Sequence, residues 1–191
     1  MLEIKMVDQS EIHTETFEVE MGAISGPTDW TMSYRLGPNT LRDFNPLPLL
    51  LQLLMEVPGL RPHSGTLYTV LAELYSNALE HGVIGRDSSL KVDPRGFADY
   101  YQKREAALQE LTDGFVEFTF EHRPTEDGGS LYLKVKDSGA GFEYENGVTA
   151  ESSDGNLHGR GIPLIRNLCE KIHYMDSGKA VEAEFLWHQE S

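Results

Sequence analysis

Three polar side chains recur at four-residue intervals in an otherwise apolar stretch of the chain: Glu73, Asn77 and His81. On an α-helix, residues four apart lie one above the other, so the three side chains are predicted to share one face. The residues that flank this polar stripe are apolar, namely Val70, Leu74 and Ala78. We therefore expect a largely buried helix that presents one row of chemically active groups.

A carboxamide and a carboxylate one helical turn apart are suited to phosphoryl transfer. Mg²⁺ is usually held by one or two protein oxygens together with phosphates and waters, and Asn77 offers such an oxygen. Glu73 could then serve as a general base toward a hydroxyl presented near a γ-phosphate. Taken alone, Glu73 would be interpreted as an ordinary acid on a helix surface.

A second group of residues follows a predicted strand, in the segment Asp137-Ser-Gly139-Ala-Gly141. A carboxylate at a strand end can accept a directed hydrogen bond, and glycines two residues apart let the backbone approach a flat or charged ligand closely. Taken alone, the pattern favours a plain turn, because turns after strands often contain Asp and Gly.

A third group, His158-Gly159-Arg160-Gly161, opens a predicted helix that begins near Ile162. Free backbone N–H groups at a helix N-terminus form a natural phosphate site, and Arg160 could add a charged donor. The alternative is a loop end that simply enters a helix. The sequence contains no GxxxxGK motif, so a P-loop does not explain this segment.

Periodicity predicts the elements that position these groups. Helical spacing of apolar residues begins after Ser64 and is expected to end at Gly82, since many helices end at glycine. A second helix is predicted from Asp93-Pro94 to Gly114, with these apolar residues at helical spacing: Phe97, Tyr101, Leu108 and Leu111. Alternation predicts strands at 30–36, 116–120, 131–135 and 181–187, and the turn-rich segment 124–130 indicates a hairpin.

The most apolar segment, residues 47–55, allows two interpretations. If helical, it is apolar nearly all round and must be buried on more than one side. The alternative to a core helix is an exposed surface that docks a partner or forms a homodimer, in which Leu50 and Leu54 would make the contact. The core helix is the favoured interpretation.

Composition narrows the class of protein. The 191 residues fit one domain that buries about 70% of its unfolded surface. Sixteen basic and thirty-one acidic residues give a net charge of −15, so we expect neither nucleic acid nor a membrane surface as partner. The single cysteine, Cys169, excludes an internal disulfide and suits a cytoplasmic location. The segment 47–55 is far shorter than the roughly 20 residues of a spanning helix, and no signal peptide opens the chain.

The order of the three groups is more specific than any one of them, and it resembles the GHKL ATPase superfamily. This resemblance covers roughly residues 30–187 and implies a Bergerat-type α/β two-layer sandwich, a mixed sheet with helices on one face. Within the superfamily, Glu73-x-x-x-Asn77-Ala-x-x-His81-Gly82 looks like the variant found in anti-sigma-factor serine kinases.

The resemblance implies a role for each position. Glu73 would be the base that activates a serine on a partner protein, Asn77 would coordinate Mg²⁺, and Asp137 would bind the adenine amino group of ATP. Residues 142–158 would form a lid over the nucleotide. The remaining implied nucleotide contacts are Gly139, Gly141, His158, Gly159, Arg160 and Gly161, with His81 either lining the site or serving in helix capping or packing.

A narrower resemblance involves the segment after Gly82, which contains Asp87-Ser-Ser-Leu-Lys91, Gly96-Phe97 and Tyr100-Tyr101. It looks like the kinase domain at the C-terminus of bacterial regulators that join a receiver to a metal-dependent phosphatase. Residues 26–191 would then be the ATP-binding kinase domain, and residues 1–25 a linker or an N-terminal edge strand. Residues 83–113 are long for a minimal anti-sigma kinase, and the sequence gives them no chemical role beyond packing.

Two functions therefore follow from the sequence. The first is a cytoplasmic Mg·ATP-dependent serine kinase that phosphorylates a small anti-sigma-factor antagonist in a bacterial partner-switching pathway, with a sigma factor as a further partner. The alternative is a non-catalytic nucleotide-binding module that sequesters a sigma factor or an antagonist.

Overall fold

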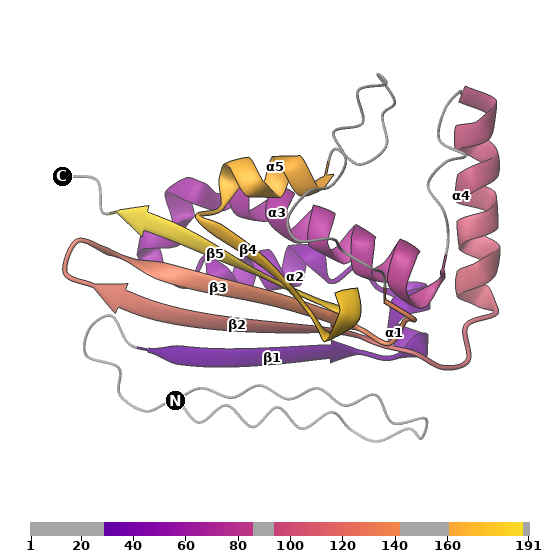
Figure 1. Cartoon of the computed structure of the whole chain (residues 1–191), viewed down its shortest axis with the longest axis horizontal. Coiled ribbons are helices and arrows are strands. Elements are labelled where there is room, and N and C mark those ends of the chain that lie inside the picture. The colour runs from indigo at the N-terminus through magenta and orange to yellow at the C-terminus, as the bar shows by residue number, and fades with distance from the viewer. Residues whose placement is uncertain (1–28, 86–93, 142–160, 189–191) are drawn as a thin grey trace.

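The computed structural model of the protein describes residues 29–85, 94–141 and 161–188. The predictions for residues 1–25, for the lid 142–158 and for His158, Gly159 and Arg160 lie outside these ranges. Within them, the structure forms two layers, a twisted five-stranded sheet and a set of helices on one of its faces (Figure 1). The predicted two-layer α/β arrangement is confirmed.

The strands pair in the order β1-β2-β3-β5-β4, and each of these pairings is antiparallel. The mixed sheet that was expected is therefore wrong for the described strands. The reason is the position of β5, which pairs with both β3 and β4 and so separates two strands that would have been parallel neighbours. The strands are β1 Trp30–Leu36, β2 Val116–Thr125, β3 Gly128–Asp137, β4 Lys171–Met175 and β5 Ala180–His188.

The predicted hairpin is present, but its turn is shorter than expected. Strand β2 continues through Pro124 to Thr125, and only Glu126 and Asp127 connect it to β3. Pro124 is tolerated because β1 pairs with β2 only as far as His122, so the ladder loses no bond on that side. The longer strands bring Asp137 to the very end of β3, opposite Val116.

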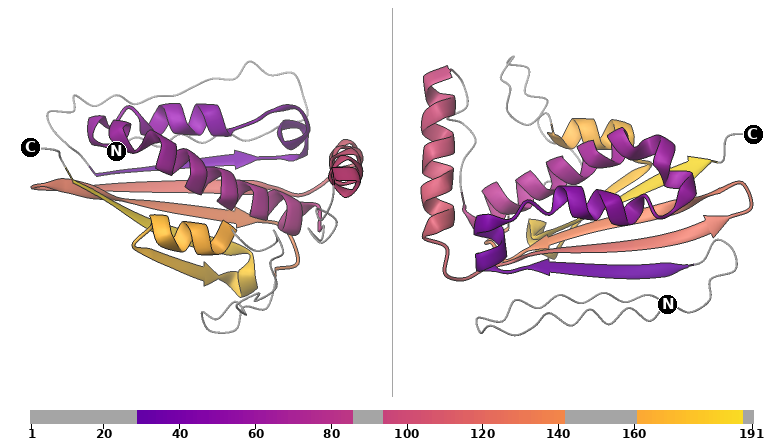
Figure 2. Two further views of the ribbon diagram at one scale, coloured as in Figure 1. Left: turned by 90° about the horizontal axis from the view of Figure 1, so that it is seen from above. Right: turned by 180° about the vertical axis from the view of Figure 1, so that it is seen from behind.

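Helices α2, α3 and α5 lie over the same face of the sheet, as the two further views show (Figure 2). Helix α4 stands upright beside this layer, next to α1. The helices are α1 Pro38–Asp43, α2 Leu47–Leu54, α3 Ser64–Asn77, α4 Pro94–Gln109 and α5 Gly161–Leu168, with a 3₁₀ turn η1 at Pro58–His63, a π-helical turn η2 at Ala78–Val83 and a 3₁₀ turn η4 at Asp176–Gly178. None of the helices in the described ranges is long and apolar enough to cross a membrane.

The core lies between the sheet and the helices, and α2 belongs to it. Leu50 and Leu54 are completely buried, whereas Pro48 and Gln52 of the same helix are exposed. The core interpretation of segment 47–55 is therefore confirmed. A docking surface built on Leu50 and Leu54 is excluded, because neither side chain reaches the surface.

Aromatic rings fill the core at the end of the strands opposite Asp137. His122 is 1% exposed and stacks between Trp30 and Trp187, with ring centroids 5.7 and 5.9 Å away. The Trp187 ring occupies the space that a Cβ on Gly59 would need, so η1 approaches β5 at contact distance. This end of the molecule is thus closed by packing.

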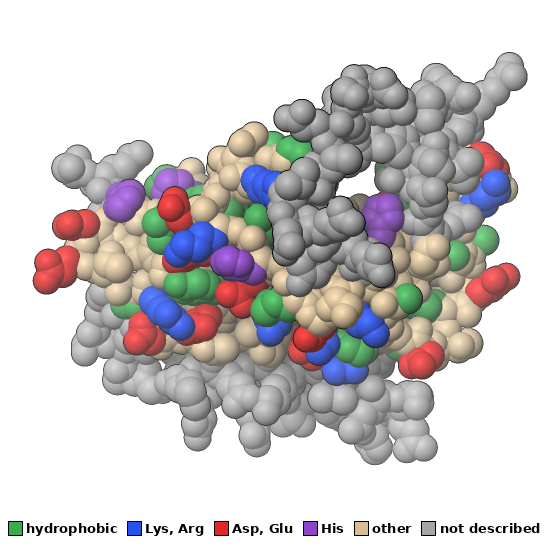
Figure 3. All heavy atoms as spheres, in the orientation of Figure 1, with side chains coloured by type: hydrophobic (Ala, Val, Ile, Leu, Met, Phe, Trp, Pro, Cys, Tyr) green, Lys and Arg blue, Asp and Glu red, His purple; other side chains and the backbone are tan. Residues whose placement is uncertain are grey.

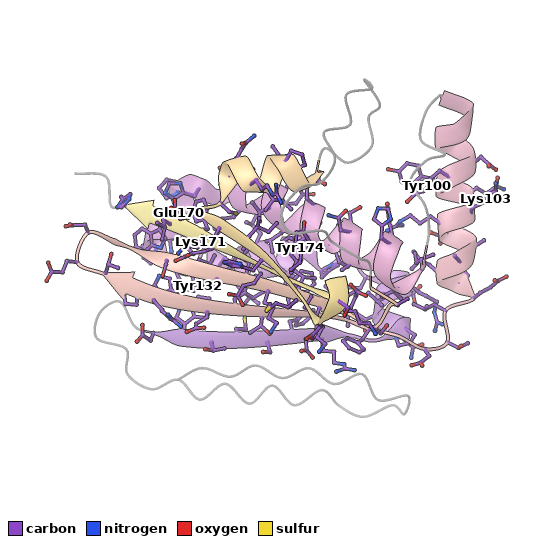
Figure 4. The ribbon with its side chains drawn as sticks, in the orientation of Figure 1. Tyr100, Lys103, Tyr132, Glu170, Lys171 and Tyr174 are labelled. Carbon is purple, nitrogen blue, oxygen red and sulfur yellow. The ribbon has the colours of Figure 1, made fainter. Side chains whose placement is uncertain are left out.

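The other face of the sheet carries paired charges. Glu184 accepts hydrogen bonds from Tyr132 (2.9 Å) and from Lys171 (2.8 Å), which joins β3, β5 and β4 (Figure 4). The Lys171 ammonium is the main reason that the pKa of Glu184 lies below its usual value. Acidic and basic side chains are interspersed over the strands in the space-filling view (Figure 3), which matches a solvated sheet face.

Candidate functional site

Helix α3 carries the first group of candidate residues, but it changes its geometry before the group is complete. The α-helix ends at Asn77 and continues as the π-helical turn η2, in which the Ile84 N–H donates to the Leu79 carbonyl at 2.9 Å. Glu73 and Asn77 lie one α-turn apart and both are partly buried. The expected four-residue stripe therefore holds for this pair.

His81 lies on the π-helical turn η2 and is exposed, whereas its neighbour Glu80 is 6% exposed. The alignment of His81 with Glu73 and Asn77, and its place in a nucleotide site, stay predictions.

Gly82 was expected to stop the helix, yet it serves a different purpose. Its φ angle is not positive, and the left-handed residue of this turn is Gly85, with φ of 64°. A Cβ on Gly82 would overlap Cγ and Oδ1 of Asp137, and a Cβ on Gly139 would overlap the Gly82 carbonyl. The two glycines let η2 and the end of β3 touch backbone to backbone.

Asp137 is 7% exposed at this contact. The Gly139 N–H donates a hydrogen bond to its Oδ1 at 2.8 Å, and its own N–H donates to the Lys179 carbonyl at 2.9 Å. Burial raises the pKa of this carboxyl above its ordinary value, while the Gly139 hydrogen bond and the Lys179 charge act in the opposite direction. A buried carboxylate beside two glycines is suited to accept a hydrogen bond from an N–H group of a flat ring.

Gly141 packs against η4 and needs its glycine for two reasons. Its φ is 81°, and a Cβ there would overlap the Ser177 carbonyl. The chain therefore leaves β3 by passing directly over the turn between β4 and β5. In the described residues, the close approach that Gly139 and Gly141 permit is between backbone segments of the protein itself.

Gly161 is the described residue of the third group, and it opens α5. A Cβ on Gly161 would overlap Oε2 of Glu73, so the start of α5 lies against the carboxylate at the middle of α3. A helix start offers free N–H groups to an anion such as phosphate. The fold thus brings Glu73 and a candidate phosphate-binding helix end together, from residues 88 positions apart in the chain.

The Asn77 side chain of α3 is a suitable ligand for a magnesium ion that is also bound by phosphate oxygens. Asn77 contributes one neutral amide oxygen, and Mg²⁺ commonly completes its coordination with phosphate oxygens and waters. The partly buried position of Asn77, one turn beyond the Glu73 carboxylate and the start of α5, is compatible with that role.

Sequence reasoning missed a group of residues that ties α4 to this region. The Tyr100 hydroxyl donates a hydrogen bond to Glu80, and Arg104 forms an ion pair with the same carboxylate. Tyr101, expected to face the core, is 53% exposed, while Tyr100 is fully buried. The expectation for Tyr101 is wrong, whereas Leu108 is 3% exposed and packs in the core as expected. An acidic residue within an apolar stretch, Glu80, is the signal that could have indicated a buried partner.

Comparison with known proteins agrees with this geometry. A model of the histidine kinase-like ATPase domain matches residues 63–185, from the start of α3 through most of β5. The chain belongs to the histidine kinase-like ATPase domain family, whose members bind ATP, typically together with Mg²⁺. The resemblance to the GHKL superfamily is confirmed at this level. A comparison with curated proteins gives no match.

Proposed function

We propose that this protein is a Mg·ATP-dependent protein-serine kinase of the anti-sigma-factor type, which phosphorylates a small anti-sigma-factor antagonist. The family membership supports ATP as the phosphoryl donor. The observation that carries the kinase proposal is the position of Glu73, whose carboxylate lies one turn from Asn77 and against the start of α5. A base in that position stands beside the groups proposed to hold the phosphates.

Each proposed role belongs to a named atom of the chain. Asp137 would accept a hydrogen bond from the adenine amino group, and the amide oxygen of Asn77 would hold Mg²⁺. Mg·ATP supplies the phosphoryl group that is transferred. The serine hydroxyl of the partner gives its proton to the Glu73 carboxylate while its oxygen bonds to the γ-phosphorus and the bond to the ADP oxygen breaks.

The remaining proposed contacts include both described and undescribed residues. Gly139, Gly141 and Gly161 shape its backbone, and His81 lines its exposed side. His158, Gly159 and Arg160, together with the lid 142–158, belong to the same proposal on the strength of the sequence resemblance. The antagonist as substrate, a sigma factor as further partner and a cytoplasmic location are proposed on the same basis.

Titration of Mg·ATP into the wild type and into Asp137→Ala tests the nucleotide site. Because a hydrogen bond to a charged group is worth about 1.5 to 3 kcal/mol, the variant should bind roughly tenfold or more weakly. If the wild type shows no binding, the likeness to the family is one of fold only, and the sequestering module becomes the better interpretation.

Transfer of radiolabelled phosphate from ATP to small antagonist proteins of the same genome tests the kinase. Loss of a general base typically lowers a rate by a hundredfold to ten-thousandfold, so Glu73→Ala should bind nucleotide but lose transfer to about that extent. Glu56→Ala, which removes an exposed carboxylate outside the site, is the matched control. Equal transfer by Glu73→Ala would refute the assigned base, and nucleotide binding without any transfer by the wild type would favour the non-catalytic module.

A further inference from the structure

Helix α4 contacts a buried carboxylate of the π-helical turn η2, and this carboxylate has no role in the proposed chemistry. Glu80 is 6% exposed and stands three residues after Asn77, on the π-helical turn η2. The Tyr100 hydroxyl donates to its Oε2, and Arg104 Nε lies 3.3 Å from its Oε1. Tyr100 lies on the side of α4 toward α3, and Lys103 on the side away from it (Figure 4).

Arg104 also acts electrostatically on a residue of α3, Tyr75. Its charge acts to lower the pKa of Tyr75, although burial dominates and raises that pKa to about 12. The Arg104 side chain is only 25% exposed, so its charge is largely removed from water together with that of Glu80. Within the described residues the Nε–H makes no hydrogen bond, and the contact with Glu80 is an ion pair.

The turn that carries Glu80 also carries the glycine that touches Asp137. Gly82 is two residues beyond Glu80, and its Cα hydrogen faces the Asp137 carboxylate at a distance that no side chain could occupy. The hydrogen bond between the Ile84 N–H and the Leu79 carbonyl closes this turn around both residues. A displacement of Glu80 would therefore displace Gly82 from Asp137.

Burial makes the link between α4 and η2 strong. A carboxylate taken out of water is destabilising unless hydrogen bonds and charges compensate it, and removing one partner of such a group has a larger effect than breaking a surface ion pair. Two of the groups that compensate Glu80 come from α4. Helix α4 thus influences the position of η2 through the Glu80 carboxylate.

We propose that Glu80, Tyr100 and Arg104 are positioning residues, through which α4 clamps η2 and sets the position of Gly82 against Asp137. The consequence for nucleotide affinity rests on the proposed function, because Asp137 is the carboxylate proposed to bind the adenine amino group. Helix α4, which follows the helix with Asn77, then helps to position the residues of the proposed nucleotide site. The clamp acts on the adenine end of the proposed site. It should therefore affect the affinities for ATP and ADP alike.

Two variants of the full chain test the clamp, each with a matched control. Tyr100→Phe removes the buried hydroxyl, and Tyr68→Phe removes an exposed one from α3. Arg104→Gln removes the buried charge, and Lys103→Gln removes an exposed charge next to it, which pairs with Asp99 within α4. Calorimetric Kd values for Mg·ATP and Mg·ADP are measured at a temperature where circular dichroism shows every variant folded.

The expected result is a roughly tenfold weaker Kd for both nucleotides in Tyr100→Phe and Arg104→Gln, with the two controls unchanged. Arg104→Lys, which keeps the charge, should recover part of the loss. Hydrogen exchange of the Ile84 amide should be faster in Tyr100→Phe than in Tyr68→Phe. If Tyr100→Phe does not fold, Arg104→Gln carries the same comparison.

A purely stabilising role would lower the melting temperature of these variants and leave both Kd values unchanged, which would overturn the proposal. Failure of the wild type to bind nucleotide would count against the proposed function, and the exchange measurement would still decide on the clamp. In that case faster exchange at Ile84 supports the clamp, and equal exchange in Tyr100→Phe and Tyr68→Phe overturns it.

Discussion

Gly82 lies directly against the carboxylate of Asp137, so closely that a single added carbon at Gly82 would overlap it. The first residue belongs to the turn that extends α3, and the second to the last position of β3. Their contact joins the helical segment with Glu73 and Asn77 to Asp137, the carboxylate proposed to bind adenine.

This contact predicts a selective defect in Gly82→Ala. The backbone of Gly82 is not left-handed, so alanine is compatible with its conformation and the effect should come from the methyl group pushing Asp137 aside. We expect Mg·ATP affinity to fall at least tenfold, measured by calorimetry. Gly65→Ala is the control, because a Cβ there meets nothing within 4 Å and should stabilise α3 by about 0.5 to 1 kcal/mol. Unchanged affinity in Gly82→Ala would show that Asp137 does not contact the nucleotide from this position.

Asp137 should make stability depend on pH in a particular direction. Its pKa is raised in the folded protein, so the folded state binds the proton more tightly than the unfolded chain does. This group therefore favours folding at low pH, and its contribution declines as pH rises from the unfolded pKa of about 3.9 through the raised folded value. Asp137→Asn has no such ionisation, so its stability relative to the wild type should increase with pH across that window.

Urea unfolding of the wild type and Asp137→Asn at several pH values from 4 to 7 measures this difference. The difference between the two proteins isolates Asp137 from the other carboxyl groups, which titrate in both. A difference that stays constant with pH would mean that the carboxyl is not desolvated in the folded state.

The contact between Gly161 and Glu73 can be tested without any nucleotide. Gly161→Ala would place a methyl group on Glu73 Oε2, and because that atom is the end of a flexible side chain that can turn aside, the loss of stability should stay near the lower end of overpacking, about 1 kcal/mol or less. In the Glu73→Ala background the obstructing carboxylate is gone, so the same substitution should be much less destabilising. A double-mutant cycle from denaturant unfolding gives the coupling energy. Additive effects would show that α5 starts away from Glu73.

Cys169 should be almost inert in the folded protein. It is buried, and burial raises its pKa from 9.0 to about 11. Because the thiolate is the reacting species, a shift of this size lowers its fraction at pH 8 by about a hundredfold. Labelling with a chromogenic disulfide reagent should therefore be slow in the native protein and fast in urea. Equal rates in the two conditions would place the thiol at the surface.

Local patterns predicted the parts of this structure that depend on local periodicity. The alternation in Trp30–Leu36 and in the 181–187 segment identifies strands that the structure contains, and the helix with Glu73 and Asn77 lies where apolar spacing places it. In each case one face of the element packs on the core, so burial and periodicity agree. The apolar segment 47–55 was predictable for the same reason, since three of its leucines are buried.

The π-turn, the contact of Gly82 with Asp137 and the clamp on Glu80 could not be predicted in this way. A switch from α to π hydrogen bonding changes the phase of only a few residues, and no apolar repeat marks it. The contacts of Gly82 and Gly161 join segments that are distant in sequence, so they depend on the packing of helices against the sheet. On α4 the hydroxyl of buried Tyr100 donates to Glu80, while the neighbouring Tyr101 is exposed, and apolar spacing alone does not distinguish two adjacent tyrosines.

The position of β5 between β3 and β4 has a consequence for how the chain folds. During synthesis, β3 and β4 emerge before the strand that separates them, and each then presents an unpaired edge. Exposed strand edges are prone to pair with other chains, and pairings between distant segments form slowly. Release of the chain before residue 188 should therefore favour aggregation, and folding of the two-layer domain should complete only after β5 has left the ribosome.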